Sequence, residues 1–290
     1  MRAGFLVAMG AAIWFAQALE ARRQQPPAVF RSGIEVVELD VSVMRGGQPV
    51  PGLSAADFVL TDNGVAQQVQ SVTLDRLPLS VTMVLDTSES VAGDRLAHLV
   101  QAGEGLTAAL HADDRAALIT FSNAVDERVG MTADLEAIRS SLRAIRGAGA
   151  TALRDAVHLA LELQPRDGTR PLVLVFTDGR DTASWLTTSA VLDSARRIGV
   201  VVHAVRVESD EFLDHLAESC GGRTWSATSD RQLRELFTRA LDEMRARYLL
   251  TYTPSGVRGP GWHELKVRLK TGRADVTARP GYFVASPLAP

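Results

Sequence analysis

The feature that most constrains the fold is a series of short, continuously aliphatic runs that alternate with segments of helical spacing. Four such runs lie at 79–85, 116–121, 172–176 and 200–205. A strand carries an unbroken aliphatic run when both of its faces are buried, as in a parallel sheet covered by helices. The alternation predicts an α/β fold, with a doubly wound and mostly parallel sheet over residues 78–247.

The segments between these runs place apolar residues three and four positions apart, as on one face of an amphipathic helix. Asp230 is expected to cap the last helix, because a carboxylate before a helix accepts hydrogen bonds from its free amides. Helices are expected at 95–110, 135–145, 152–163, 187–198 and 230–247.

Shorter β segments flank this region, over residues 30–77 and 248–286. The first opens with a largely alternating apolar pattern, which indicates a strand with one buried face. Asn63-Gly64, after the apolar run 58–60, is a strong signal for a tight hairpin turn. Residues 287–290 are expected to be a tail.

The N-terminus is typical of a secretory signal peptide. Arg2 is followed by an uncharged, mostly apolar run over residues 3–19, and Ala16-Gln17-Ala18 matches the small-x-small cleavage pattern. We interpret residues 1–21 as a signal and expect export to the periplasm, cell surface or medium, with no membrane span after cleavage. The alternative is a retained anchor, since the run is at the lower limit for spanning a bilayer.

The composition excludes two classes of function. The 31 Lys and Arg residues nearly balance the 34 Asp and Glu residues, for a net charge of −3, so the basic excess that grips nucleic acid is missing. Cys220 is the single cysteine, which excludes an internal disulfide framework and a zinc–thiolate site. We expect Cys220 to be a small buried residue.

Oxygen-bearing side chains follow the predicted strands at the edge where α/β sheets bind ligands, the carboxyl ends of the strands. Two carboxylates and three hydroxyls without imidazole or thiolate suit Mg²⁺ or Mn²⁺ rather than zinc. The candidate metal ligands are Asp86, Ser88, Ser90, Thr151 and Asp178.

This set resembles the metal-ion-dependent adhesion site of a von Willebrand factor type A domain, with Asp-x-Ser-x-Ser, a later threonine and Thr-Asp-Gly in order. The resemblance implies that the hydroxyls coordinate directly and the carboxylates directly or through water, and that a partner's acidic side chain fills the sixth position. The flanks and the closing Arg279-Pro280-Gly281-Tyr282-Phe283 resemble the bacterial group of related proteins, which implies one small β-sandwich built from both terminal segments.

The leading hypothesis is an exported, metal-dependent protein-interaction module for adhesion or scaffolding, and not an enzyme. Motifs such as the Gly-x-Ser-x-Gly elbow, the phosphate loop and His-Glu-x-x-His are missing. Two alternatives remain open. One is a metal-assisted hydrolase or phosphatase using Asp86, with Glu89 or Asp181 as base, and the other is a purely structural envelope component.

Several other side chains near the site have simpler interpretations. Glu89 is expected to face solvent and Asp181 to be a solvated loop carboxylate. Trp185, in the loop after Asp178, is either an exposed interface anchor or part of local packing. The six histidines are scattered and are expected to be surface or core residues rather than metal ligands.

Overall fold

The computed structural model describes residues 36–74, 77–165, 167–257 and 259–285. The predicted signal peptide and the predicted tail both lie outside these residues. Within the described ranges, no helix has the length and apolar character needed to cross a membrane.

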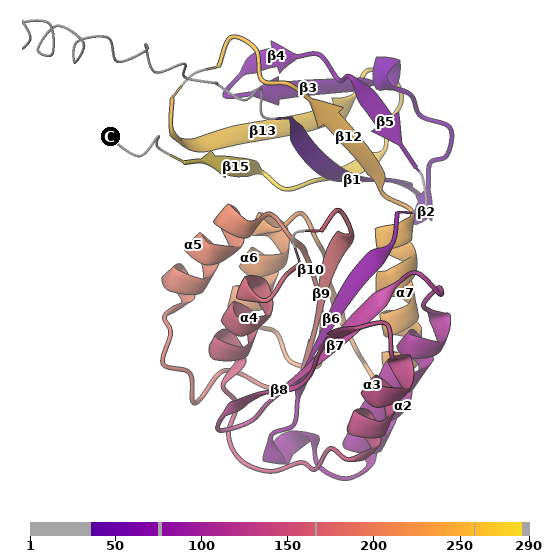
Figure 1. The fold of residues 1–290 in the computed structure, drawn as a ribbon, viewed down its shortest axis with the longest axis vertical. Coiled ribbons are helices and arrows are strands. Elements are labelled where there is room, and N and C mark those ends of the chain that lie inside the picture. The colour runs from indigo at the N-terminus through magenta and orange to yellow at the C-terminus, as the bar shows by residue number, and fades with distance from the viewer. Residues whose placement is uncertain (1–35, 75–76, 166, 258, 286–290) are drawn as a thin grey trace, which may run out of the picture. The chain divides into compact units, whose positions relative to one another are not determined.

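A six-stranded sheet forms the centre of the α/β region, in the order β11-β10-β9-β6-β7-β8 (Figure 1). Every neighbouring pair is parallel except β7 and β8. All eight residues of β6 are buried, as its aliphatic sequence predicts. The strands are β6 (Leu79–Asp86), β7 (Arg115–Phe121), β8 (Val125–Thr132), β9 (Arg170–Thr177), β10 (Val201–Arg206) and β11 (Thr224–Ser226). The predicted doubly wound, mostly parallel sheet is confirmed.

Helices cover both faces of this sheet (Figure 1). On one face lie α2 (Asp94–Ala109), α3 (Leu135–Arg143) and α7 (Leu233–Arg245). On the other lie α4 (Leu153–Glu162), α5 (Thr188–Ile198) and α6 (Glu211–Ser219). Two separate apolar cores result, one on each side of the sheet, so both faces of every central strand are buried.

Three elements of this region were not predicted, namely β8, β11 and α6. Strand β8 lies at the sheet edge with no buried residue, so it lacks the aliphatic run that marks the central strands. Helix α6 did carry a readable signal: Asp210 caps it by accepting from Leu213 N at 3.1 Å. Cys220 follows the last residue of the helix and is buried as expected, and burial raises the pKa of its thiol to about 12.

The predicted cap at Asp230 is wrong. Asp230 begins a short 3₁₀ turn, η3 (Asp230–Gln232), and α7 starts after it without a side-chain cap. The Asp230 carboxylate instead accepts from Arg95 Nε at 2.9 Å. A long-range ion pair has taken the place of the local capping bond.

The flanking segments interleave in two further antiparallel sheets, β14-β1-β12-β5 with β2 on β1, and β15-β13-β3-β4. Their buried apolar side chains form one shared core. The predicted turn is present, since Asn63 and Gly64 both have positive φ between β3 and β4. The strands are β1 (Val37–Arg45), β2 (Gln48–Pro49), β3 (Phe58–Asp62), β4 (Val65–Gln67), β5 (Ser71–Thr73), β12 (Tyr248–Tyr252), β13 (Gly261–Leu269), β14 (Asp275–Thr277) and β15 (Gly281–Val284).

One buried carboxylate joins the two flanking segments. Asp62 Oδ2 accepts from Tyr252 Oη at 2.9 Å and from Tyr282 Oη at 2.8 Å. Asp62 Oδ1 lies 3.0 Å from His263 Nδ1. Burial and the contact with Asp62 raise the pKa of Tyr282 to about 12. A single side chain of the N-terminal segment thus satisfies polar groups on three strands of the C-terminal segment.

We expect Asp62→Ala to lower the free energy of unfolding by about 3 kcal/mol, because it leaves buried donors without an acceptor. Urea unfolding followed by fluorescence measures the change. The control is Asp126→Ala, whose side chain is 59% exposed and whose loss should cost less than about 0.5 kcal/mol. Equal stability of the two variants would contradict this account.

A second buried ionic cluster joins α7 to β10. Glu243 Oε2 lies 2.7 Å from His203 Nε2, and both Nε and Nη2 of Arg247 donate to Glu243 at 2.9 Å. His203 Nδ1 accepts from Arg223 N at 3.0 Å, so the proton of a neutral ring lies on Nε2, facing the carboxylate. Burial raises the pKa of Glu243, but the bonds from His203 and Arg247 outweigh it, and the net shift is downward.

We expect Glu243→Gln to cost about 3 kcal/mol at neutral pH, since it leaves the fully buried Arg247 without a counter-charge. The native pKa of Glu243 lies below its ordinary value of 4.5, so the unfolded state takes up the proton first as pH falls. The wild type should therefore lose stability below about pH 5, while the variant lacks this contribution. Urea unfolding at several pH values tests this, and the same acid dependence in both proteins would refute it.

Candidate metal centre

The parallel pairing of β6 with β9 brings the two predicted carboxylates together. Asp86 is the last residue of β6, and Asp178 follows the last residue of β9. Leu85, one residue before Asp86, pairs with Phe176, two residues before Asp178. Both carboxylates are buried, with Asp86 at 0% and Asp178 at 4% exposure. The two strand ends therefore present two acids at the edge where the sequence predicts the site.

Hydrogen bonds link four of the five predicted residues. Ser88 N donates to Asp86 Oδ1 at 2.8 Å. The hydroxyls of Ser88 and Ser90 lie 3.1 Å apart, and Ser90 Oγ donates to Asp178 Oδ1 at 2.7 Å. The loop that closes β6 thus connects to the carboxylate after the neighbouring strand through the Ser90 hydroxyl, with the Ser88 hydroxyl beside it.

The fifth residue, Thr151, lies in an adjoining loop. Ala148 N donates to Thr87 O, and Glu89 N donates to Gly149 O, both at 2.9 Å. Gly149 has a φ of +89°, a backbone conformation that favours glycine, and a Cβ there would lie 2.9 Å from Asn123 Oδ1. Thr151 is buried. In the part of the chain that the structure describes, its hydroxyl makes no hydrogen bond to the other four residues.

The two carboxylates differ in their counter-charges. Burial raises the pKa of Asp86, and hydrogen bonds from Thr177 and Ser88 offset only part of this. Thr177 Oγ1 donates to Asp86 Oδ2 at 2.6 Å. No cationic side chain contacts Asp86 among the described residues. Asp178, by contrast, forms an ion pair with Arg95 from the first turn of α2.

Sequence reasoning missed Arg95 and Thr177. Thr177 precedes Asp178 in the Thr-Asp-Gly sequence, so a signal for it was available, but its bond to Asp86 depends on the pairing of β6 with β9. Arg95 carries no local signal, because its position beside Asp178 depends on how α2 packs after the loop. The same guanidinium donates to Asp230, 135 residues further along the chain.

The loop after Asp178 is held rigidly and corrects one prediction. Asp181 is not a solvated carboxylate: it accepts from Arg154 N at 2.9 Å and from both N and Oγ of Ser184. Burial raises its pKa, but these hydrogen bonds outweigh it and lower the pKa. Asp181 is therefore engaged and is a poor candidate for a general base. Glu89 is exposed, as expected.

Trp185 is an exposed aromatic residue, and the packing alternative is wrong. Trp185 is 94% exposed, while its backbone N donates to Asp155 Oδ2 at 2.9 Å. Thr182 N and Ala183 N donate to Thr151 O, so this loop adjoins the predicted site. The exposed indole is therefore attached to a loop whose backbone is hydrogen-bonded to its neighbours.

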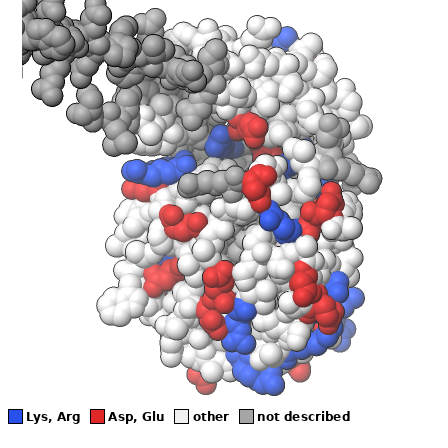
Figure 2. Space-filling model, in the orientation of Figure 1, with Lys and Arg blue, Asp and Glu red and all other residues white. Residues whose placement is uncertain are grey.

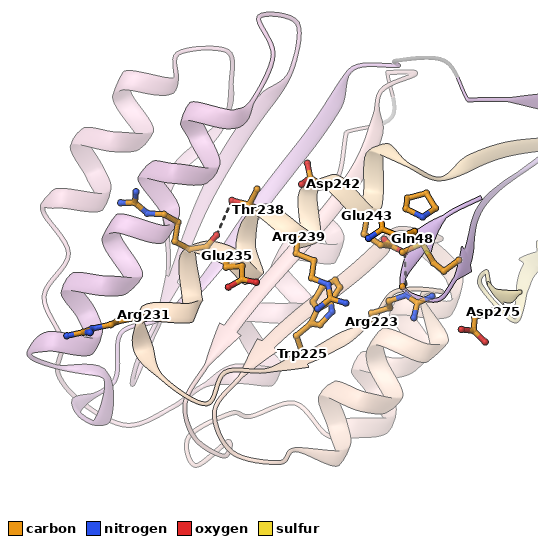
Figure 3. A pocket seen from close by; sticks show the side chains of 14 residues that line it. Gln48, Arg223, Trp225, Arg231, Glu235, Thr238, Arg239, Asp242, Glu243 and Asp275 are labelled. Atoms are coloured by element: carbon orange, nitrogen blue, oxygen red, sulfur yellow. Dashed lines mark hydrogen bonds and ion pairs between the residues drawn. The ribbon is translucent and has the colours of Figure 1, made fainter. Parts of the chain in front are cut away.

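A hollow of about 760 Å³ lies away from these residues, between α7, β11 and the β1–β2 turn (Figure 3). Its lining includes four arginines and four carboxylates, so it favours no ligand of one charge. None of the five predicted ligands lines it. Figure 2 likewise shows acidic and basic side chains interspersed over the face that it draws.

Residues 81–180 match the family model of the von Willebrand factor type A domain. The chain contains a von Willebrand factor type A domain. The match confirms the resemblance carried by the Asp86-x-Ser88-x-Ser90 sequence, and it covers the strands that hold both carboxylates. Among curated proteins, no sequence matches the chain at a significant level.

Solved structures of A domains have the same fold. Proximal thread matrix protein 1 from the mussel byssus, with a zinc-occupied MIDAS motif, is 17% identical with a TM-score of 0.54, over 63% of this chain and 49% of that one. The vWF domain of the type V pili tip protein Mfa5 from Porphyromonas gingivalis is 12% identical with a TM-score of 0.50, over 64% and 99%. At such identities the likeness concerns the fold alone.

The donors of the A domain fit a hard divalent cation. The cluster supplies oxygen ligands only, and one of its buried carboxylates lacks a positive partner among the described residues. An unpaired buried charge is costly, and a divalent cation would offset it. Carboxylate and hydroxyl oxygens are the ligands that Mg²⁺ and Mn²⁺ prefer.

A second group of donors, His111, Asp113 and Asp114, does not fit as well. Their ligand atoms lie within 4.8 Å of one another, but the Asp114 carboxylate is already engaged. It accepts from Leu79 N, from His111 N and from Arg245 Nη2, each at 2.8 Å. This group lies at the amino ends of β6 and β7, the opposite edge of the sheet from Asp86.

We expect Asp86→Asn to stabilise the metal-free protein by about 1 kcal/mol at neutral pH, as removal of a destabilised functional-site charge commonly does. The amide can accept from Ser88 N and donate to Thr177 Oγ1, whose hydroxyl can turn to Gly179 O, 3.0 Å away. Urea unfolding in EDTA measures this. Destabilisation by the variant would show that the Asp86 charge is compensated in the native protein.

Proposed function

We propose that the protein is an exported interaction module whose A domain binds a partner protein through a divalent cation, Mg²⁺ or Mn²⁺. In this proposal the A domain spans residues 78–247, and residues 30–77 and 248–286 form one β module beside it. A partner's acidic side chain completes the coordination, and the setting is adhesion or scaffolding at the cell envelope. The proposed metal ligands are Asp86, Ser88, Ser90, Thr151 and Asp178.

One observation carries this proposal. Two buried carboxylates and two serine hydroxyls form a hydrogen-bonded cluster at the carboxyl edge of the sheet, and only Asp178 has a cationic partner among the described side chains. A cluster built only for stability would pair both charges or replace them with apolar groups. The excess negative charge favours a cation site.

The chain's own residues would divide the work as follows. Asp86 would provide the uncompensated negative charge, and Ser88 and Ser90 would provide neutral oxygen ligands that leave positive charge on the ion. Thr177 would hold Asp86 in place through its hydroxyl. When bound, the ion would supply the positive charge that accepts a carboxylate oxygen of the partner.

The surroundings of the site support a protein partner. The displayed indole of Trp185 offers a large rigid apolar contact, of the kind that anchors protein interfaces. The A domains of similar fold include those of a matrix protein from the mussel byssus and of a pili tip protein. The N-terminal sequence pattern of the present chain favours export as well.

We expect isothermal titration calorimetry to show one Mg²⁺ or Mn²⁺ ion per chain, with no detectable binding by Asp86→Ala. The matched control is Asp113→Ala, which alters the other group of donors at the opposite edge of the sheet. Binding that survives Asp86→Ala unchanged, or that disappears in Asp113→Ala, would sink the site assignment.

We expect immobilised protein to capture envelope proteins in Mn²⁺ but not in EDTA, and Asp86→Ala to capture none in either buffer. Metal-independent capture would favour the structural alternative. Turnover of phosphoester probes, lost in Asp86→Ala, would favour the hydrolase. The four capture measurements, with two proteins in two buffers, together with the turnover assay separate the three functions.

A further inference from the structure

Arg95 lies between two carboxylates that belong to distant parts of the chain. Its Nη1 pairs with Asp178 Oδ2, and its Nε donates to Asp230 Oδ1 at 2.9 Å. The Asp178 side chain is 1% exposed, whereas those of Arg95 and Asp230 are 30% and 29% exposed. One end of this bridge is therefore buried at the proposed metal site, and the other is partly solvated.

The ion pair between Arg95 and Asp178 uses the same carboxylate that the proposed metal ion needs as a ligand. Asp178 Oδ1 faces Ser90 Oγ, and Oδ2 faces the guanidinium. Two cations that share one carboxylate repel each other strongly at short range in a buried site, where solvent screening is weak. Each must weaken the other's hold on Asp178.

Asp230 provides a second carboxylate partner for Arg95, which allows the metal ion to replace Arg95 at Asp178. It lies in η3, before α7, and holds Arg95 through a different nitrogen from the one that contacts Asp178. If Arg95 gives up Asp178, the guanidinium keeps a carboxylate partner and is not stranded. Asp230 thus leaves Arg95 with one of its two carboxylate partners when Asp178 is released.

We propose that Arg95 is a built-in counter-cation that competes with the divalent ion for Asp178 and moves toward Asp230 when the ion binds. This inference rests on the proposed metal site. Arg95 weakens metal affinity and stabilises the metal-free protein by neutralising a buried carboxylate. It is a positioning residue, since it acts through Asp178 rather than on a partner.

The test is Mn²⁺ titration by calorimetry of the wild type and three variants. Arg95→Gln removes the competing charge and should tighten Mn²⁺ binding roughly tenfold. Asp230→Asn leaves Arg95 with Asp178 alone and should weaken binding about threefold. In the double variant, Asp230→Asn should have no further effect, because Asp230 acts through Arg95.

A second readout separates this role from a merely structural one. In EDTA, Arg95→Gln should lower the melting temperature, because Asp178 loses its counter-charge, and saturating Mn²⁺ should raise it by more than in the wild type. The matched control is Arg115→Gln, which breaks the pair with Asp167 at a similar exposure of 31%. That variant should leave the Mn²⁺ affinity unchanged.

The outcomes distinguish this inference from the proposed function. Wild-type Mn²⁺ binding with equal or weaker binding by Arg95→Gln would overturn the competition and leave the metal site standing. Tighter binding by Arg95→Gln, including binding that appears only in that variant, supports it. If neither protein binds Mn²⁺, both the metal site and the competition are overturned.

Discussion

The arrangement of the candidate site depends on the parallel pairing of β6 with β9. In this register the two buried strands end side by side, so Asp86 and Asp178 both lie at the carboxyl edge of the sheet. Charges at such a position cannot be screened by water, so each must find a partner or remain as a cost to stability. In the loops that close the site, Ser90 donates to Asp178, Thr177 donates to Asp86, and Gly149 adopts a positive φ two residues before Thr151.

Buried charges elsewhere in the chain are treated differently. Asp62 and Glu243 are surrounded by donors that satisfy them, from three strands in one case and from Arg247 and His203 in the other. These clusters hold distant segments together. Asp86 is also fully buried, but it accepts only from Ser88 N and Thr177 Oγ1 and has no histidine or arginine beside it in the described structure. The lack of a basic neighbour among the described residues sets Asp86 apart from the carboxylates of the structural clusters.

The sequence predicted those parts of the structure whose signal is local. Unbroken aliphatic runs identified the central strands, and apolar spacing identified five of the helices on the sheet. Strand β8 was missed because an edge strand with exposed faces has no such run. The Asp230 cap was wrong because local pattern reasoning cannot see that Arg95, from a helix far away in the sequence, offers this carboxylate a charged partner.

By itself, the sequence determined the α/β class, the order of the four central strands along the chain and the oxygen-bearing side chains that follow them, since burial and strand direction follow from residue type and spacing. Only the tertiary structure decided which of those carboxylates is neutralised. Arg95 reaches Asp178 and Asp230 because α2, β9 and η3 converge in space, and Asp62 meets its donors because the two ends of the chain interleave. Such contacts depend on the packing of elements far apart in the sequence, so the local sequence around each residue does not predict them.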